Sequence, residues 1–166
     1  RSRGLGDVYK RQLRLVSALK TGQVDLVASD HAPHRLDEKM RENIWEVTPG
    51  IPGLETTLPL LLTQFNRGRI SLRRVIEVLS ENPAKIFGFK TKGHLKTGYD
   101  ADLTIVDLTK KFTIDSSKFY SKAKYSPFDG WEVIGKPVQT WVQGKLVMDD
   151  EMIVADPGTG RVIGVA

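Results

Sequence analysis

The sequence predicts an α/β unit followed by a small β domain. Residues 13–29 combine apolar residues at helical spacing with a short, almost wholly apolar run, which together make one helix-and-strand unit. Beyond about residue 92, helical spacing gives way to alternating apolar and polar residues separated by turn residues, as in β-strands. The sequence therefore divides into an α/β part at 13–92 and a β part at 93–150.

The α/β part is predicted to start with a helix that includes Leu13 and Leu19 and ends at Gly22, which suits a C-terminal cap. The run "VDLVAS" at 24–29 follows at once and is typical of a parallel strand buried on both faces. Loop 30–53 is too long for a simple connection, and loops of that length are usually functional. Its charged first part is expected to be mobile, whereas prolines and glycines stiffen its end, "TPGIPG".

Three helices are predicted after this loop. The first covers residues 54–68, with its regular part starting near Pro59. Ser71 is expected to cap the second, and Asn82 with the following proline is expected to open a third that Gly88 ends. The inward-facing residues predicted for the first two helices are Leu54, Leu58, Leu61, Leu62, Phe65, Leu72, Val75, Ile76 and Leu79.

The β part is predicted from "GYDADLTIVDL", "KFTID" and "PVQTWVQGKLVM", the last of which reads as a hairpin turning at Gly144. Residues 151–166 look like a loose tail. Two polar residues with candidate chemistry are expected to be structural. Glu55 stands where a carboxylate favours a helix start, and His94 stands in a turn.

Residues 1–12, "RSRGLGDVYKRQ", show no apolar period and no clear cap, and we expect them to be a non-native segment outside the fold. They carry much of the net charge of +5, because removing 4 of 25 basic and 1 of 20 acidic residues leaves +2. The remainder shows no basic stripe with interleaved aromatic residues, so a nucleic-acid partner is not expected. No apolar run approaches the roughly 20 residues of a membrane span, and no secretory signal is visible.

The chain has no cysteine, which suits a reducing cytoplasm and leaves only His, Asp and Glu as metal ligands. Such residues gather in "DHAPH", directly after the predicted strand. In a barrel of parallel strands the active site lies at the carboxyl ends of the strands, where Asp30 can ligate a cation or act as a general base. Pro33 would hold His34 away from the strand axis. The same residues also fit a capping aspartate and solvated histidines, since Asp-His-x-x-His alone is not a zinc spacing.

Five stretches, in order, resemble the C-terminal part of dihydroorotases, which are cyclic amidohydrolases of the amidohydrolase superfamily. They are "DLVASDHAPH", "TPGIPGLETTLPLLL", "ENPAKIFG", "GYDADLTIVDL" and "SPFDGWEVIGKPVQTWVQGKLV". The resemblance runs from about Leu13 to Val147. It implies the C-terminal part of a metal-dependent (β/α)₈ TIM barrel, followed by a small β-sandwich-like domain built from both chain ends.

The resemblance assigns roles to four residues. Asp30 matches the aspartate that ends the last barrel strand, ligates one of two zinc ions and handles the proton of the attacking hydroxide. His34 matches the histidine that hydrogen-bonds the substrate near its carboxylate. Pro49 and Gly50 match the loop whose backbone contacts the pyrimidine ring. His31 has no ligand role in this pattern, and a supporting role is expected.

The implied reaction is the zinc-dependent, reversible cyclisation of N-carbamoyl-L-aspartate to dihydroorotate, a step of pyrimidine biosynthesis. The remaining metal ligands of the family, a His-x-His pair, a bridging carboxylate and two further histidines, match nothing in this sequence. We therefore expect this chain alone to bind zinc weakly and to be inactive. Calorimetric titration with zinc tests this expectation.

Two other functions remain open. An allantoinase or a dihydropyrimidinase-like enzyme shares the strand-end aspartate, although those families usually lack a histidine at the position of His34. A non-catalytic dihydroorotase-like subunit would instead support a partner such as aspartate transcarbamoylase. If the protein is an enzyme of either kind, its substrate is expected to be a small molecule. Association into a homo-oligomer is a further expectation.

Overall fold

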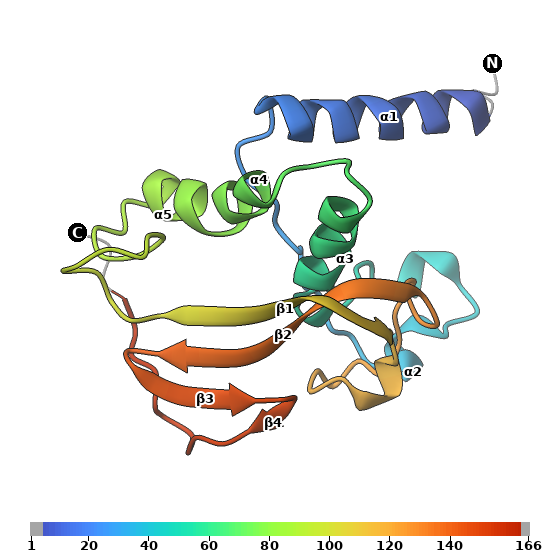
Figure 1. Cartoon of the computed structure of the whole chain (residues 1–166). Helices are drawn as coiled ribbons and strands as arrows, with labels where there is room; N and C mark the ends of the chain where they lie inside the picture. Colours follow the sequence, from blue (N-terminus) through green and yellow to red (C-terminus); the bar gives the residue numbers. More distant parts are fainter. Residues whose placement is uncertain (1–4, 164–166) are drawn as a thin grey trace.

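The computed structural model describes residues 5–163, with side chains from residue 10 onward. Figure 1 shows α1, α3, α4 and α5 on one side of a four-stranded sheet, with α1 furthest from the strands in this view, while the short α2 lies beside one end of the sheet. The helices are α1 (Leu5–Thr21), α2 (Leu36–Lys39), α3 (Leu54–Asn66), α4 (Leu72–Ile76) and α5 (Asn82–Ile86). Short 3-10 turns are η1 (Ile44–Glu46) and η3 (Ser116–Lys118), and η2 (Glu77–Glu81) is a π-helical turn. The strands are β1 (Leu103–Thr113), β2 (Glu132–Val142), β3 (Lys145–Asp149) and β4 (Met152–Ile153).

Helix α1 starts earlier than the sequence predicted. It begins at Leu5, so residues 5–12 are helical although the sequence shows no apolar period or clear cap there, while residues 1–4 lie outside the described part. That residues 1–12 are non-native stays a prediction. Residues 5–12 contain no proline, and Leu5, Lys10, Arg11 and Gln12 are good helix formers even without an apolar stripe. The predicted end at Gly22 is correct, since the helix stops at Thr21 and Gly22 has a positive φ of 84°.

The expected strand at 24–29 is not formed. The segment has no strand partner within residues 5–163, and its side chains are half-buried or exposed. The reason is non-local, because a parallel strand needs neighbouring strands and the four described strands all belong to one antiparallel sheet. In place of a ladder, the backbone of Val27 donates a hydrogen bond to the carbonyl of Val78 (3.1 Å) in η2.

Helix α3 begins at Leu54, so the prediction that its regular part starts near Pro59 is wrong. Leu61 and Leu62 are buried as predicted, whereas Leu54 is 66% exposed. Thr56, Pro59 and Thr63 are buried in its place. The cause is the sheet, because Leu62 packs against Gly135 of β2 and the Thr63 hydroxyl accepts the backbone hydrogen bond of Ile134 (2.9 Å).

Ser71 caps α4 as predicted, and its hydroxyl accepts a hydrogen bond from the backbone of Arg74 (3.1 Å). The third predicted helix does not have a start of its own. Instead α4, η2 and α5 form one continuous helical run, because Glu81 and Asn82 both have right-handed helical dihedral angles. Asn82 therefore does not act as an N-cap, although Gly88 ends the run with a φ of 73°.

The sheet is antiparallel with the order β1-β2-β3-β4. The predicted hairpin between β2 and β3 is confirmed, with Gln143 and Gly144 both at positive φ. The start of the predicted tail is wrong, because Met152 and Ile153 pair with β3. Within the described residues the strands make one sheet covered by α3, and no second sheet completes a sandwich.

Helices and sheet share one core. Leu62, Val75 and Val78 are buried together, and Val106 and Leu108 of β1 pack against this cluster. The two parts of the chain on either side of the predicted boundary at residues 92–93 therefore pack against each other through a common apolar core. Over residues 5–163, every helix is too short or too polar to cross a membrane.

Candidate functional site

Two chain segments that the sequence singled out lie side by side. The backbone nitrogen of Ala32 donates to the carbonyl of Ile51 (3.0 Å), and His31 forms an isolated parallel bridge with Ile51. The segment 29–34, which holds Asp30 and His34, is thus paired with 49–53, which holds Pro49 and Gly50. The structure therefore brings both predicted groups of site residues to one place.

Two glycines allow this close approach. Gly50 has a φ of +105°, and a Cβ at this position would lie 2.4 Å from the Cβ of Ala32. At Gly53 a Cβ would lie 2.8 Å from the carbonyl oxygen of Ser29. Any larger residue at either position would push the two segments apart, so packing requires both glycines, and at Gly50 the left-handed backbone conformation favours glycine as well.

His31 connects the two segments through its side chain. Its Nδ1 accepts hydrogen bonds from the backbone nitrogens of Gly53 (3.0 Å) and Leu54 (3.3 Å). These are two of the N–H groups that the start of α3 leaves without a helical partner. The imidazole therefore caps α3, which is the supporting role expected for this residue.

Asp30 adopts a left-handed conformation with a φ of 46°. Aspartate tolerates this region better than most residues, and outliers of this kind often occur at functional sites. The residue is exposed, and the hydrogen bonds found among residues 5–163 leave its carboxylate free. An exposed carboxylate at a sharply turned position is open to a ligand.

His34 faces an acidic residue that sequence reasoning missed. Its Nδ1 lies 3.7 Å from a carboxylate oxygen of Glu38, and the His34 side chain is 37% exposed. Glu38 also accepts the backbone hydrogen bond of Arg35 (2.7 Å) at the start of α2. This short helix lies where a mobile charged stretch was expected. The i, i+4 spacing of the histidine and the glutamate was the available signal.

Glu55 has a structural role, as expected. In addition to its place at the start of α3, it binds backbone N–H groups of a distant loop. Its two carboxylate oxygens accept hydrogen bonds from the backbone nitrogens of Tyr120 (2.9 Å) and Ser121 (3.0 Å). The carboxylate thereby connects α3 to the loop that follows η3. His94 is 48% exposed and lies edge-on to Tyr99 and 3.5 Å from Glu81, which agrees with a turn position.

The described residues do not form a metal centre by themselves. Between residues 5 and 163, no three side chains of His, Cys, Asp or Glu are grouped so that they could hold an ion. Asp30 can offer one carboxylate, and a stable site for zinc needs three or four ligands. The donor set therefore fits a metal only if further ligands come from outside these residues.

A cavity of about 910 Å³ lies away from the paired segments, between α3 and the sheet. Its lining includes Glu55, Phe112, Tyr120 and Lys136, and none of the predicted site residues. The Lys136 ammonium is paired with Glu151 (2.5 Å) and lies over the ring of Phe112. The cavity therefore gives no support to the predicted chemistry, and the paired segments remain the better candidate.

Comparison with known proteins agrees with the sequence-based resemblance. The model of the amidohydrolase family matches residues 11–147. The dihydroorotase of Methanothermobacter thermautotrophicus is 46% identical over 141 residues, which are 85% of this chain and 32% of that enzyme. The dihydroorotase of Pyrococcus abyssi is 44% identical over 144 residues, or 87% of this chain and 34% of the enzyme. The chain thus spans about a third of the length of these relatives.

Hydantoinases are similar as well. The L-hydantoinase of Paenarthrobacter aurescens is 43% identical over 155 residues, which cover 91% of this chain and 34% of that enzyme. The solved structure of L-hydantoinase (dihydropyrimidinase) from Arthrobacter aurescens superposes with a TM-score of 0.85, at 43% identity over 90% of this chain and 34% of its own. Because the family model covers most of the sequence and the fold agrees, this chain belongs to the amidohydrolase family.

Proposed function

We propose that this chain forms the C-terminal part of a dihydroorotase, which interconverts N-carbamoyl-L-aspartate and dihydroorotate. The observation that carries the proposal is the identity of 46% and 44% to two dihydroorotases. The pairing of segment 29–34 with 49–53 supports it, because the four residues assigned by the resemblance then lie on adjoining backbone.

Asp30 is the proposed proton carrier. Opening or closing a cyclic amide requires a base that takes a proton from the attacking oxygen and an acid that returns one to the leaving nitrogen. A single carboxylate can do both in turn, and Asp30 is exposed and free to reach a substrate. His34 would donate a hydrogen bond to the substrate carboxylate, and the backbone at Pro49 and Gly50 would contact the ring.

Zinc is the metal that we propose for the assembled enzyme, with Asp30 as one of its ligands. Two zinc ions of the family type would lower the pKa of bound water and polarise the carbonyl. The described residues supply too few donors for such a centre, so we assign Asp30 one coordination position and derive no step through the ions. On its own the chain is then proposed to be inactive.

A hydantoinase or dihydropyrimidinase is the second candidate. The observation in its favour is the 43% identity to L-hydantoinase over 155 residues, together with the TM-score of 0.85. Both candidates open cyclic amides, so Asp30 would act alike in each. They differ at His34, which has a role only where the substrate carries a carboxylate. Allantoinase and a non-catalytic subunit that supports aspartate transcarbamoylase are further alternatives without a specific observation in their favour.

A hybrid enzyme tests the proposal. In it, residues 13–147 of this chain replace the matching part of the M. thermautotrophicus dihydroorotase, and purified protein is assayed with dihydroorotate, hydantoin and allantoin. The proposal predicts turnover of dihydroorotate and a loss of it on His34→Ala. A folded hybrid that hydrolyses hydantoin but not dihydroorotate would favour the second candidate, and one that is inactive on all three would contradict both.

The proposed setting follows from the proposed chemistry. The substrates are small polar metabolites, and a chain without cysteine suits a reducing compartment, so we infer a cytoplasmic location. A homo-oligomer or an association with aspartate transcarbamoylase is a further proposal. Size measurement of the full enzyme with and without the transcarbamoylase distinguishes the two.

A further inference from the structure

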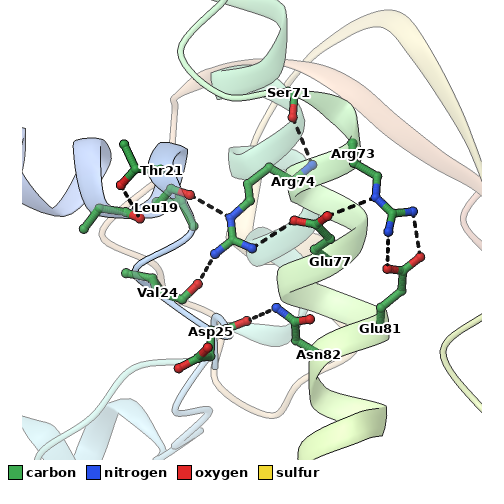
Figure 2. Close-up of polar contacts among 11 residues, drawn as sticks. Leu19, Thr21, Val24, Asp25, Ser71, Arg73, Arg74, Glu77, Glu81 and Asn82 are labelled. Atoms are coloured by element: carbon green, nitrogen blue, oxygen red, sulfur yellow. Dashed lines mark hydrogen bonds and ion pairs between the residues drawn. The ribbon is translucent and has the colours of Figure 1, made fainter.

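Within residues 5–163, the segment before Asp30 is held by hydrogen bonds with the helical run α4–η2–α5. Three groups on this run, at residues 74, 78 and 82, are spaced four apart and reach the backbone of residues 24–27. Figure 2 shows Arg74 and Asn82 pointing from the run toward Val24 and Asp25. Spacing of four residues places groups on one face of a helix, so these three groups form a stripe on the helical run that faces residues 24–27.

Arg74 makes the first contact. The residue is only 7% exposed. Its Nε donates to the carbonyl of Leu19 (2.7 Å), and one terminal nitrogen donates to the carbonyl of Val24. The other terminal nitrogen is paired with Glu77 (3.0 Å), which compensates the buried charge. The guanidinium thus fixes the turn by which the chain leaves α1 and enters the segment.

The π-helical turn provides the second contact. The backbone nitrogen of Asn82 donates to the carbonyl of Glu77, five residues back, rather than to Val78 as it would in a regular α-helix. The next residue, Pro83, has no N–H to offer. The carbonyl of Val78 is therefore available, and it accepts the hydrogen bond of Val27 (3.1 Å). The π-helical turn thus leaves the Val78 carbonyl free of a helical partner, so that it can accept the hydrogen bond from Val27.

Asn82 makes the third contact, through its side chain. Its Nδ2 donates to the carbonyl of Asp25 (2.7 Å). With Arg74 and Val78, this gives backbone partners to residues 24, 25 and 27 within one short stretch. Asp30 follows only three residues after the last of them, and His31 is fixed in turn by its contact with Gly53.

From these contacts we infer that Arg74 and Asn82 are positioning residues, which set the path of residues 24–27 and through it the placement of the Asp30 carboxylate. The effect on catalysis rests on the proposed function, whereas the effect on the path of residues 24–27 can be measured in this chain alone. Because a catalytic carboxylate must be held to a fraction of an ångström, loosening the segment lowers turnover more than substrate binding.

The matched variants are Asn82→Asp, Arg74→Lys and, as a control, Arg73→Lys. Asn82→Asp keeps the shape of the side chain but removes the donor to Asp25. Arg74→Lys keeps the charge beside Glu77 but cannot reach two carbonyls and a carboxylate together. Arg73 is 65% exposed and contacts Glu77 and Glu81, not the segment, so its replacement changes the same ion-pair network without touching residues 24–27.

The first readout is nuclear magnetic resonance of the full 166-residue chain, which needs no activity. Both test variants should accelerate amide exchange of Val27 by about ten-fold or more and shift the amide signals of Asp30 and His31, while the control leaves them unchanged. If Arg74→Lys does not fold, Asn82→Asp decides alone. Signals of residues 27–31 that match the control in a folded Asn82→Asp chain would overturn the inference.

The second readout is the kinetics of the hybrid enzyme. Asn82→Asp should lower kcat about ten- to a hundred-fold with little change in KM, as losses of supporting contacts around a catalytic centre do. A kcat equal to that of Arg73→Lys in an active hybrid would overturn the inference and leave the proposed function intact. An inactive hybrid would count against the proposed function, and the resonance readout would still decide the positioning.

Discussion

The imidazole of His31 is hydrogen-bonded to the backbone nitrogen of Gly53, 22 residues further along the chain, at 3.0 Å. This contact fixes the residue next to Asp30 to the start of α3. It therefore couples the stability of a long helix to the geometry of the candidate site.

Replacing His31 by alanine should destabilise the chain by about 1 kcal/mol, which is the usual loss when the side chain that caps a helix start is removed. Urea unfolding measures this, and amide exchange at Gly53 and Leu54 should become faster. His94→Ala is the control, because that half-exposed histidine stands outside the paired segments. Equal destabilisation by the two variants would show that the cap contributes nothing.

Gly50→Ala should cost about 1–3 kcal/mol more than Gly68→Ala. Both glycines have positive φ, at +105° and +68°, so both alanines carry backbone strain. Only at Gly50 would the new Cβ meet another atom, 2.4 Å away on Ala32, whereas nothing lies within 4 Å at Gly68. Thermal unfolding of both variants isolates the clash, and melting temperatures that fall equally would mean that segments 29–34 and 49–53 are not in contact.

Acid should destabilise this chain partly through Glu77. Hydrogen bonds from Arg74 and then Arg73 hold the pKa of the Glu77 carboxyl below its ordinary value. A carboxyl whose pKa is lower in the folded than in the unfolded state adds stability above its unfolded pKa, and this stability is lost as pH falls through the folded pKa. Hydrogen bonds to backbone or side-chain donors lower the pKa in the same way at Asp100, Asp107, Asp115 and Asp129.

Glu77→Gln tests this contribution. The variant should be less stable than the parent chain near neutral pH, and the difference should shrink as the pH is lowered into the acid range. Chemical unfolding at a series of pH values measures the two curves. Curves that stay parallel down to the lowest pH would contradict the role of Glu77.

Zinc should bind the isolated chain weakly, because residues 5–163 offer no group of three ligands and tight sites need that many. Calorimetric titration at neutral pH should show no saturable binding of one or two equivalents. Tight stoichiometric binding that is lost on Asp30→Asn would contradict the prediction and would mean that the chain assembles a metal centre unaided.

Local signals in the sequence predicted the features that depend on neighbouring residues. The Ser71 cap, the hairpin at Gly144 and the ends of helices at Gly22 and Gly88 all follow from turn and cap chemistry. The unpaired state of 24–29 could not be predicted this way, because strand formation depends on partners far away in the chain.

The candidate site shows the same division. The pattern "DHAPH" marked Asp30 and His34, and the resemblance added Pro49 and Gly50. Sequence patterns could not predict the contact between His31 and Gly53, nor the contacts of Arg74 and Asn82 with residues 24–27. These contacts join residues 22 to 57 positions apart. The π-helical turn was also missed, since nothing but Pro83 hints at it in the sequence.

The central claim is that Asp30 is the carboxylate on which cyclic-amide turnover depends. The measurement is kcat of the hybrid enzyme on dihydroorotate, for the variant Asp30→Asn and for the control Asp37→Asn. The Asp37 carboxylate lies in α2, is 63% exposed and is paired with Arg35. We predict that Asp30→Asn lowers kcat at least about a hundred-fold and that Asp37→Asn leaves it unchanged. An Asp30→Asn hybrid that is as active as the Asp37→Asn hybrid would contradict the claim.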